Sequence, residues 1–185
     1  MIDNIWSGWR SEYVSGLGSG DGEGRGRNRS GPSIFRKILD SGLSDEEAFI
    51  VHRSARVFTI MNSFPYAAGH VLVLPYRQVA EISDLDPDEF RELWTEVQRA
   101  VEVLRDTLEP DGFNIGINLG AASGGSVSEH LHVHVVPRWF GDANFMVSTA
   151  SVKAIPEALD VTASRLRSAW ELRKNEVGTD RKDQS

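Results

Sequence analysis

The stretch that decides the fold lies at residues 130–136 and reads HLHVHVV. Histidines alternate here with apolar residues, and successive side chains of a β-strand point to opposite faces. A strand would therefore place three imidazoles on one face and Leu131, Val133 and Val135 on the other. We expect the histidine face to carry chemistry, because clustered histidines usually mark proton or metal sites.

Three interpretations of these histidines stay open on the residues alone. A plain half-buried strand with polar residues outward is the first. A metal site is the second, but side chains four apart in a strand lie roughly 13 Å from each other, so three cannot converge on one ion. Zinc would also need further ligands, and the chain has five histidines and no cysteine. In the third, a neutral imidazole attacks phosphorus while its neighbours orient it and donate protons to the leaving phosphate.

A loop of small residues stands directly before the histidines, at residues 120–127, and reads GAASGGSV. Such a loop can turn several backbone N–H groups toward an anion, and the Ser126 hydroxyl adds another donor. The alternative is a simple hairpin connection. Because glycine permits close approach of the backbone to a ligand, the position of the loop favours a phosphate-binding role.

The remaining patterns predict an α+β fold with an antiparallel sheet of about five strands, one long helix and a C-terminal helix. Asp86 is placed to cap the long helix, Pro87 suits its first position and Pro110 ends it. The second helix is expected from about Pro156 into the region of Trp170. The strands are expected at residues 49–51, 57–61, 70–75, 112–120 and 130–136.

The 185 residues suit one domain of ordinary size with attached segments. Residues 1–15 hold two tryptophans and a tyrosine, so we expect this aromatic segment to dock on the core. Residues 16–32 are rich in glycine and arginine, which predicts a flexible loop. The folded domain is expected at residues 33–174, and a disordered tail at 175–185.

Composition excludes several classes of function. The formal net charge is −7, and a mostly acidic surface argues against nucleic-acid binding. The sequence holds no run of about 18 apolar residues that could span a membrane, and no signal-peptide pattern, so we expect a cytoplasmic protein. The absence of cysteine removes disulfides and thiolate zinc sites.

The histidine stretch resembles the signature of the histidine triad (HIT) nucleotide-binding family, which is His-x-His-x-His followed by two apolar residues. Residues 62–75 read NSFPYAAGHVLVLP and resemble the family's Asn…Pro…Gly-His-x-Leu-Val-x-Pro segment. Residues 118–120 and 124–126 fall where the family has its nucleotide-binding polar residues. The resemblance covers roughly residues 33–172 and implies a HIT-like fold.

The resemblance also implies a role for each candidate residue. His132 is then the nucleophile toward the α-phosphorus, His134 serves the departing phosphate and His130 orients the site. Substrate is held by a further set of polar and aromatic residues, namely Asn62, His70, Asn118, Gly125, Ser126 and Trp139. Structural alternatives stay open for three members of this set: a turn residue at 62, a single structural bond at 70 and ordinary packing at 139.

Residues 137–146 and the aromatic N-terminal segment resemble one branch of the family, the actinobacterial diadenosine tetraphosphate phosphorylases. This branch implies a nucleotidyl-histidine intermediate and phosphorolysis of diadenosine tetraphosphate by inorganic phosphate to ATP and ADP, with ATP adenylyltransferase activity in reverse. The alternatives are a dinucleoside polyphosphate hydrolase or nucleoside phosphoramidase of the same family. A nucleotide-binding protein without turnover is a further alternative, which the intact triad disfavours.

The same resemblance implies the partners and cofactors. The partners are nucleotides, inorganic phosphate and a second copy of the chain in a homodimer, which doubles to a tetramer in some members. No metal is required for the chemistry. Many members open with Cys-x-x-Cys and bind structural zinc, whereas residues 33–36 here read SIFR. We therefore expect no structural zinc, and expect the N-terminal aromatic residues to hold this end of the domain.

Overall fold

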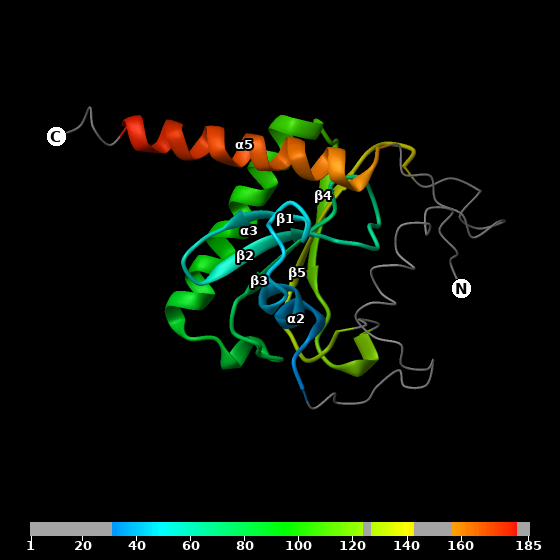
Figure 1. The fold of residues 1–185 in the computed structure, drawn as a ribbon. Helices are drawn as coiled ribbons and strands as arrows, with labels where there is room; N and C mark the ends of the chain where they lie inside the picture. Colours follow the sequence, from blue (N-terminus) through cyan, green and yellow to red (C-terminus); the bar gives the residue numbers. More distant parts are fainter. Residues whose placement is uncertain (1–30, 124–126, 143–156, 181–185) are drawn as a thin grey trace.

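The computed structural model describes residues 31–123, 127–142 and 157–180. Its framework is one antiparallel sheet of five strands in the order β1-β2-β3-β5-β4 (Figure 1). The strands are β1 Ile50–Arg53, β2 Val57–Met61, β3 Val71–Pro75, β4 Gly112–Ile117 and β5 Val133–Arg138. The predicted α+β class and the antiparallel sheet are therefore confirmed.

Three α-helices of the described residues cover the sheet: α2 Ile34–Asp40, α3 Pro87–Leu108 and α5 Leu159–Asp180. Two 3-10 turns, η1 Ile82–Asp84 and η2 Ala121–Ser123, lie in the connections. The predicted long helix and C-terminal helix are both present. The sequence does not predict α2, because seven residues are too few to show a helical period. Within the described ranges, none of the helices is both long and apolar enough to cross a membrane.

The two faces of the sheet carry separate hydrophobic clusters. On one face α3 and α5 pack over the strands, with Trp170 of α5 fully buried among them. On the other face α2 packs Phe35 and Ile38 against the strands. Figure 1 shows α3 and α5 together on one side of the sheet and α2 on the other. Leu131, Val133 and Val135 of stretch 130–136 belong to the α3/α5 cluster, so its histidines lie on the α2 face.

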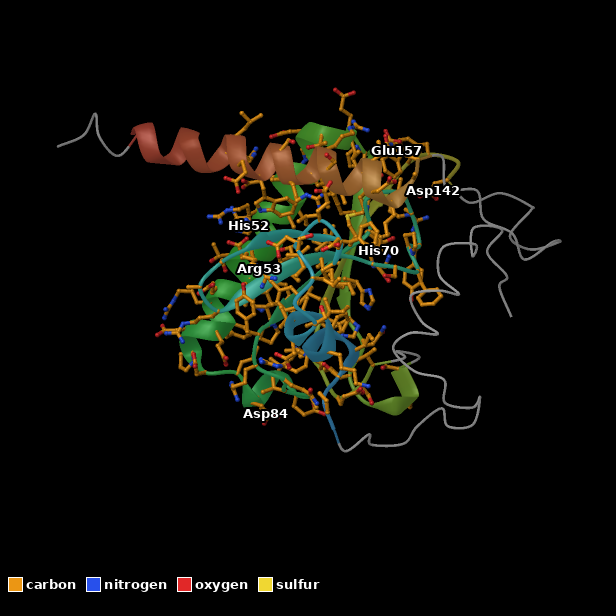
Figure 2. The ribbon with its side chains drawn as sticks, in the orientation of Figure 1. His52, Arg53, His70, Asp84, Asp142 and Glu157 are labelled. Atoms are coloured by element: carbon orange, nitrogen blue, oxygen red, sulfur yellow. The ribbon has the colours of Figure 1, made fainter. Side chains whose placement is uncertain are left out.

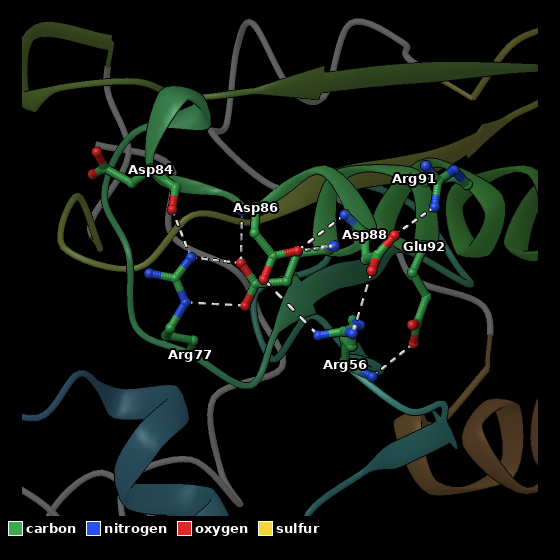
Figure 3. Close-up of polar contacts among 8 residues, drawn as sticks. Arg56, Arg77, Asp84, Asp86, Asp88, Arg91 and Glu92 are labelled. Carbon is green, nitrogen blue, oxygen red and sulfur yellow. Dashed lines mark hydrogen bonds and ion pairs between the residues drawn. The ribbon is translucent and has the colours of Figure 1, made fainter.

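The start of α3 is fixed by the predicted cap. The Asp86 carboxylate accepts hydrogen bonds from the N–H groups of Asp88 and Glu89, and the Glu89 carboxylate accepts one back from the Asp86 N–H. Arg77, in the loop after β3, donates to both carboxylate oxygens of Glu89. Arg56 of the β1–β2 turn lies within ion-pair distance of Asp86 and Asp88 (Figure 3). These contacts tie two connections of the sheet to one helix end.

The bounds of β1 and β3 differ from the prediction by one or two residues, and larger differences occur in β4 and β5. β5 begins at Val133 rather than at residue 130, because the Leu131 N–H donates to the Val79 carbonyl at 2.6 Å and so leaves the sheet ladder. β4 ends at Ile117, three residues before the predicted end. The first two triad histidines therefore lie in the segment that leads into β5, and only the third lies in the strand.

The C-terminal end of the domain also differs from expectation. α5 continues to Asp180, whereas the sequence predicts a disordered tail from residue 175. Arg173 forms ion pairs with Glu102 and Asp106 of α3, which hold the C-terminal half of α5 against that helix. The aromatic N-terminal segment and most of the glycine-rich loop lie outside the described residues, so their predicted docking is not described.

Candidate active site

His130 is held by hydrogen bonds on both sides of its ring. Its Nε2 lies 2.8 Å from the carbonyl oxygen of Pro75, which ends β3, and its Nδ1 lies 2.7 Å from Oγ of Ser33, which caps α2. A carbonyl oxygen only accepts, so Nε2 carries the proton and Nδ1 accepts from the Ser33 hydroxyl. The ring is fully buried, with the Phe35 ring edge-on at 5.5 Å. His130 is therefore a fixed, neutral imidazole.

His132 adopts the tautomer that a nucleophile needs. Its Nδ1 lies 2.8 Å from the backbone oxygen of His130 and donates to it. The lone pair is therefore on Nε2, for which the described part of the chain provides no hydrogen-bond partner. The Phe35 ring packs against this imidazole with the two ring centroids 5.4 Å apart, and the centroid of the His134 ring lies 4.9 Å from that of His132.

A chain of hydrogen bonds runs from the backbone through His70 to His134. The Tyr66 N–H donates to Nδ1 of His70 at 3.0 Å, which leaves the proton of His70 on Nε2. This Nε2 donates to Nδ1 of His134 at 3.0 Å, so the proton of His134 lies on its own Nε2. His134 therefore offers an N–H donor beside the lone pair of His132.

Burial keeps the triad imidazoles neutral near pH 7. It lowers the pKa of His130 and of His132 below the usual 6.5. Burial, with a smaller contribution from the charge of His132, lowers the pKa of His134 to about 4. A neutral His132 can attack phosphorus. A neutral His134 donates a hydrogen bond, and a bound polyphosphate would raise its pKa, because a nearby negative charge favours imidazolium.

The loop between β2 and β3 brings His70 into the cluster. Gly69 has a φ of 71°, which strains residues with a Cβ, and a Cβ there would also lie 2.3 Å from the Leu108 side chain of α3, so this position favours glycine. The Asn62 Oδ1 accepts from the Phe64 N–H at 2.9 Å, and its Nδ2 lies 3.2 Å from Nδ1 of His70. Asn62 thus shapes the loop that carries His70, which favours the turn interpretation over ribose binding for this residue.

β4 and the residue that follows it supply the other side of His134. The Nδ2 position of Asn118 lies 3.3 Å from Nε2 of His134, and rotation of the amide would place its oxygen there as an acceptor for the imidazole N–H. Gly116 pairs with His134 across the strands, and a Cβ at this glycine would meet nothing within 4 Å. The space beside His134 is therefore open on the β4 side.

One predicted substrate residue, Trp139, is placed apart from this cluster. Gly125 and Ser126 lie outside the described residues. Trp139 lies in the turn after β5, where its backbone N–H donates to a carboxylate oxygen of Asp142 at 3.2 Å. It is five residues from His134, which is about 16 Å along an extended chain. The turn therefore lies apart from the histidines of the same chain.

The fifth histidine takes no part in the site. His52 of β1, labelled in Figure 2, lies on the α3/α5 face. Its ring stacks on that of Trp170 with the ring centroids 5.7 Å apart, and its Nε2 is 3.4 Å from a carboxylate oxygen of Glu96. For the metal alternative, no group of three or more His, Cys, Asp or Glu side chains in the described ranges has the arrangement to hold an ion.

Sequence reasoning missed two residues that contact the histidines. Ser33 contacts His130, although 97 positions of the chain separate the two residues. The residues around Ser33 indicate only that it caps a helix. The Tyr66 ring lies 4.8 Å from the His70 ring and 6.0 Å from the His134 ring, nearly parallel to the latter at 19°. An aromatic residue beside a loop proline is the one signal that marks Tyr66.

Comparisons with known proteins agree with this geometry. The family model described as the HIT domain matches residues 44–141. The AP-4-A phosphorylase of Mycobacterium tuberculosis (strain ATCC 25618 / H37Rv) is 48% identical over 128 residues, which are 69% of this chain and 66% of that protein. This chain thus spans slightly less than two thirds of that relative.

Two further matches extend the comparison. The bis(5'-adenosyl)-triphosphatase of Dictyostelium discoideum is 33% identical over 126 residues, which are 65% of this chain and 84% of that protein. The crystal structure of a zinc-bound histidine triad family protein from Mycobacterium smegmatis superposes with a TM-score of 0.64 at 27% identity, covering 78% of this chain and 96% of that one.

Proposed function

The chain belongs to the HIT domain family, and on this premise we propose that it is a nucleotidyltransferase that works through a nucleotidyl-histidine intermediate. The reaction is phosphorolysis of diadenosine tetraphosphate by inorganic phosphate to ATP and ADP, with ATP adenylyltransferase activity in reverse. One observation carries the proposal: the Nδ1–H of His132 is bonded to the His130 carbonyl, so its lone pair is on Nε2. The 48% identity to an AP-4-A phosphorylase supports the choice of substrate.

In the first step, Nε2 of His132 attacks the α-phosphorus of diadenosine tetraphosphate. A P–N bond forms while the bond from this phosphorus to the bridging oxygen breaks, and ATP leaves. The His130 carbonyl, which accepts from Nδ1 of His132, stabilises the positive charge that grows on the ring. The Nε2–H of His134 donates to the departing oxygen. The substrate nucleotide is thereby held on His132 as a phosphoramidate.

In the second step, an oxygen of inorganic phosphate attacks the same phosphorus. The P–N bond breaks, Nε2 of His132 recovers its lone pair and ADP is released. If water attacks instead, the products are ATP and AMP, and the enzyme is a hydrolase. Hydrolysis is the second candidate, because the same histidines serve both acceptors and a relative at 33% identity is a triphosphatase.

Product analysis separates these candidates. The full chain is incubated with diadenosine tetraphosphate, with and without inorganic phosphate, and ADP is scored against AMP. We expect equal amounts of ADP and ATP in continued turnover, which requires phosphate; without phosphate, no more than one equivalent of ATP per chain should appear. ATP and AMP at the same rate with or without phosphate would establish the hydrolase. Binding without products would leave a nucleotide-binding protein, and loss of turnover with a chelator would establish a metal requirement.

We further propose that the working unit is a cytoplasmic homodimer. β4 lies at one edge of the sheet, and its Ile115 side chain is 46% exposed. An edge strand with exposed apolar residues favours pairing with another copy of the chain. Sedimentation should give twice the chain mass, or four times if the dimers pair. A monomer at assay concentration would refute this proposal and leave the product analysis unaffected.

A further inference from the structure

We propose that Ser33 is a positioning residue for nucleotidyl transfer, and that it acts through His130 on the nucleophile His132. The inference rests on the proposed function and adds to it a residue outside the histidine signature. The Ser33 Oγ lies 2.7 Å from Nδ1 of His130, although 97 positions separate the two residues in the chain. Both residues are buried, with 1% and 0% of their surface exposed.

The Ser33 hydroxyl does more than cap a helix. As the cap of α2, its oxygen accepts from the Arg36 N–H at 3.1 Å, and this bond uses a lone pair only. The hydroxyl proton remains, and it is directed at His130, because the other nitrogen of that ring must donate to the Pro75 carbonyl. Capping alone leaves this donor unexplained.

The backbone of Ser33 is held independently of His130. The side-chain amide of Gln78 accepts from the Ser33 N–H at 2.7 Å and donates to the Gly31 carbonyl at 3.0 Å. The amide thus bridges the two residues that flank position 32. Because the chain is fixed on this side, the hydroxyl of Ser33 can hold the His130 ring rather than follow it.

The His130 ring transmits this constraint to the nucleophile. With Nδ1 bound to Ser33 and Nε2 bound to Pro75, the ring cannot rotate without losing two hydrogen bonds. The His130 backbone is fixed with its ring, and its carbonyl accepts from Nδ1 of His132 at 2.8 Å. Without the hydroxyl, Nδ1 of His130 becomes a buried acceptor without a donor, which costs free energy. We then expect His132 to divide between its two tautomers.

Three variants of the full chain test this role. Ser33→Gly removes the hydroxyl but keeps an acceptable helix cap, since glycine at this position costs only a few tenths of a kcal/mol relative to serine. Ser33→Thr keeps both the donor and the acceptor. Ser44→Gly is the matched control, because Ser44 also accepts from the N–H three residues on, that of Glu47, in a turn away from the histidines.

Two measurements are made on each variant. The first is the ring-nitrogen NMR spectrum of His130 and His132, which reports the tautomers with or without turnover. The second is the steady-state rate with diadenosine tetraphosphate and phosphate. For Ser33→Gly we expect mixed tautomers at His132 and a kcat about tenfold lower at nearly unchanged KM. Ser33→Thr and Ser44→Gly should behave as the wild type.

The outcomes separate this inference from the proposed function. If Ser33→Gly keeps the wild-type tautomer of His132, the positioning role is refuted. A kcat within twofold of the wild type refutes it as well. If the wild type itself shows no turnover, the proposed function fails, and the NMR spectra alone then decide whether Ser33 controls the His132 tautomer. A lower kcat that Ser33→Thr does not restore also counts against the role, because threonine retains the hydroxyl.

Discussion

Replacing His70 by leucine tests the hydrogen-bond chain that orients His134. In the folded chain, His70 accepts from the Tyr66 N–H and donates to Nδ1 of His134, both at 3.0 Å. Leucine has a similar volume but can neither accept nor donate a hydrogen bond through its side chain. The change therefore removes these two hydrogen bonds, one that holds the loop before β3 and one that sets the tautomer of His134, together with the contact from Nδ2 of Asn62.

The magnitude follows from these two bonds. A typical hydrogen bond contributes about 1 kcal/mol net, so His70→Leu should lower the free energy of unfolding by about 2 kcal/mol. Without the hydrogen bond from His70, His134 is no longer oriented toward the leaving oxygen. The transition state then loses about 1–1.5 kcal/mol of stabilisation, which lowers kcat about tenfold. His70→Gln retains an amide donor for His134 and should recover part of kcat.

The assay compares two substrates with the same α-phosphorus. Diadenosine tetraphosphate releases a polyphosphate that His134 must stabilise, whereas the p-nitrophenyl ester of AMP releases a phenolate that needs little help. We expect the tenfold loss in His70→Leu with the first substrate and less than about threefold with the second. An equal loss with both substrates would refute the orientation of His134 by His70, because the defect would then lie at the nucleophile or in folding.

Three further predictions concern the open space, the core and pH. Gly116→Val should fold at least as stably as the wild type, since a Cβ at this position meets nothing within 4 Å. Its kcat/KM should fall tenfold or more, because the valine side chain enters the space beside His134. Unchanged kinetics would contradict this prediction. Trp170→Ala should lower the free energy of unfolding in urea by about 3–5 kcal/mol, because the indole is fully buried between α5 and the sheet. A loss below about 1 kcal/mol would contradict the packing. The pKa of His134 is about 4 in the folded chain and 6.5 in the unfolded chain, so between these pH values the unfolded chain binds more protons. The free energy of unfolding should therefore fall as the pH drops from 6.5 to 4. A His134→Asn variant whose free energy of unfolding falls with the same slope would contradict the assignment.

Features coded by neighbouring residues were predictable. β2 has the predicted bounds, because its five apolar and β-branched residues are bounded by turn residues. α3 begins at Pro87 as predicted, since its cap and first turn lie within four residues of each other. The division of stretch 130–136 into an apolar and a histidine face follows from strand periodicity.

Features that depend on distant contacts were not predictable. Ser33 contacts His130 only because α2 packs beside the end of β3, and nothing near residue 33 specifies that. β5 starts late because Leu131 binds the Val79 carbonyl, a partner 52 residues away. α5 extends past the predicted end because α3 provides carboxylates for Arg173.

Capture of the covalent intermediate tests the role of His132 most directly. The full chain is mixed with diadenosine tetraphosphate without phosphate, quenched in alkali because phosphoramidates are acid-labile, digested and examined by mass spectrometry. We expect an AMP group on His132, its conversion to ADP when phosphate is added before the quench, and no AMP group in His132→Ala. Turnover by the wild type with AMP on another residue, or undiminished turnover by His132→Ala, would contradict nucleophilic attack by this imidazole.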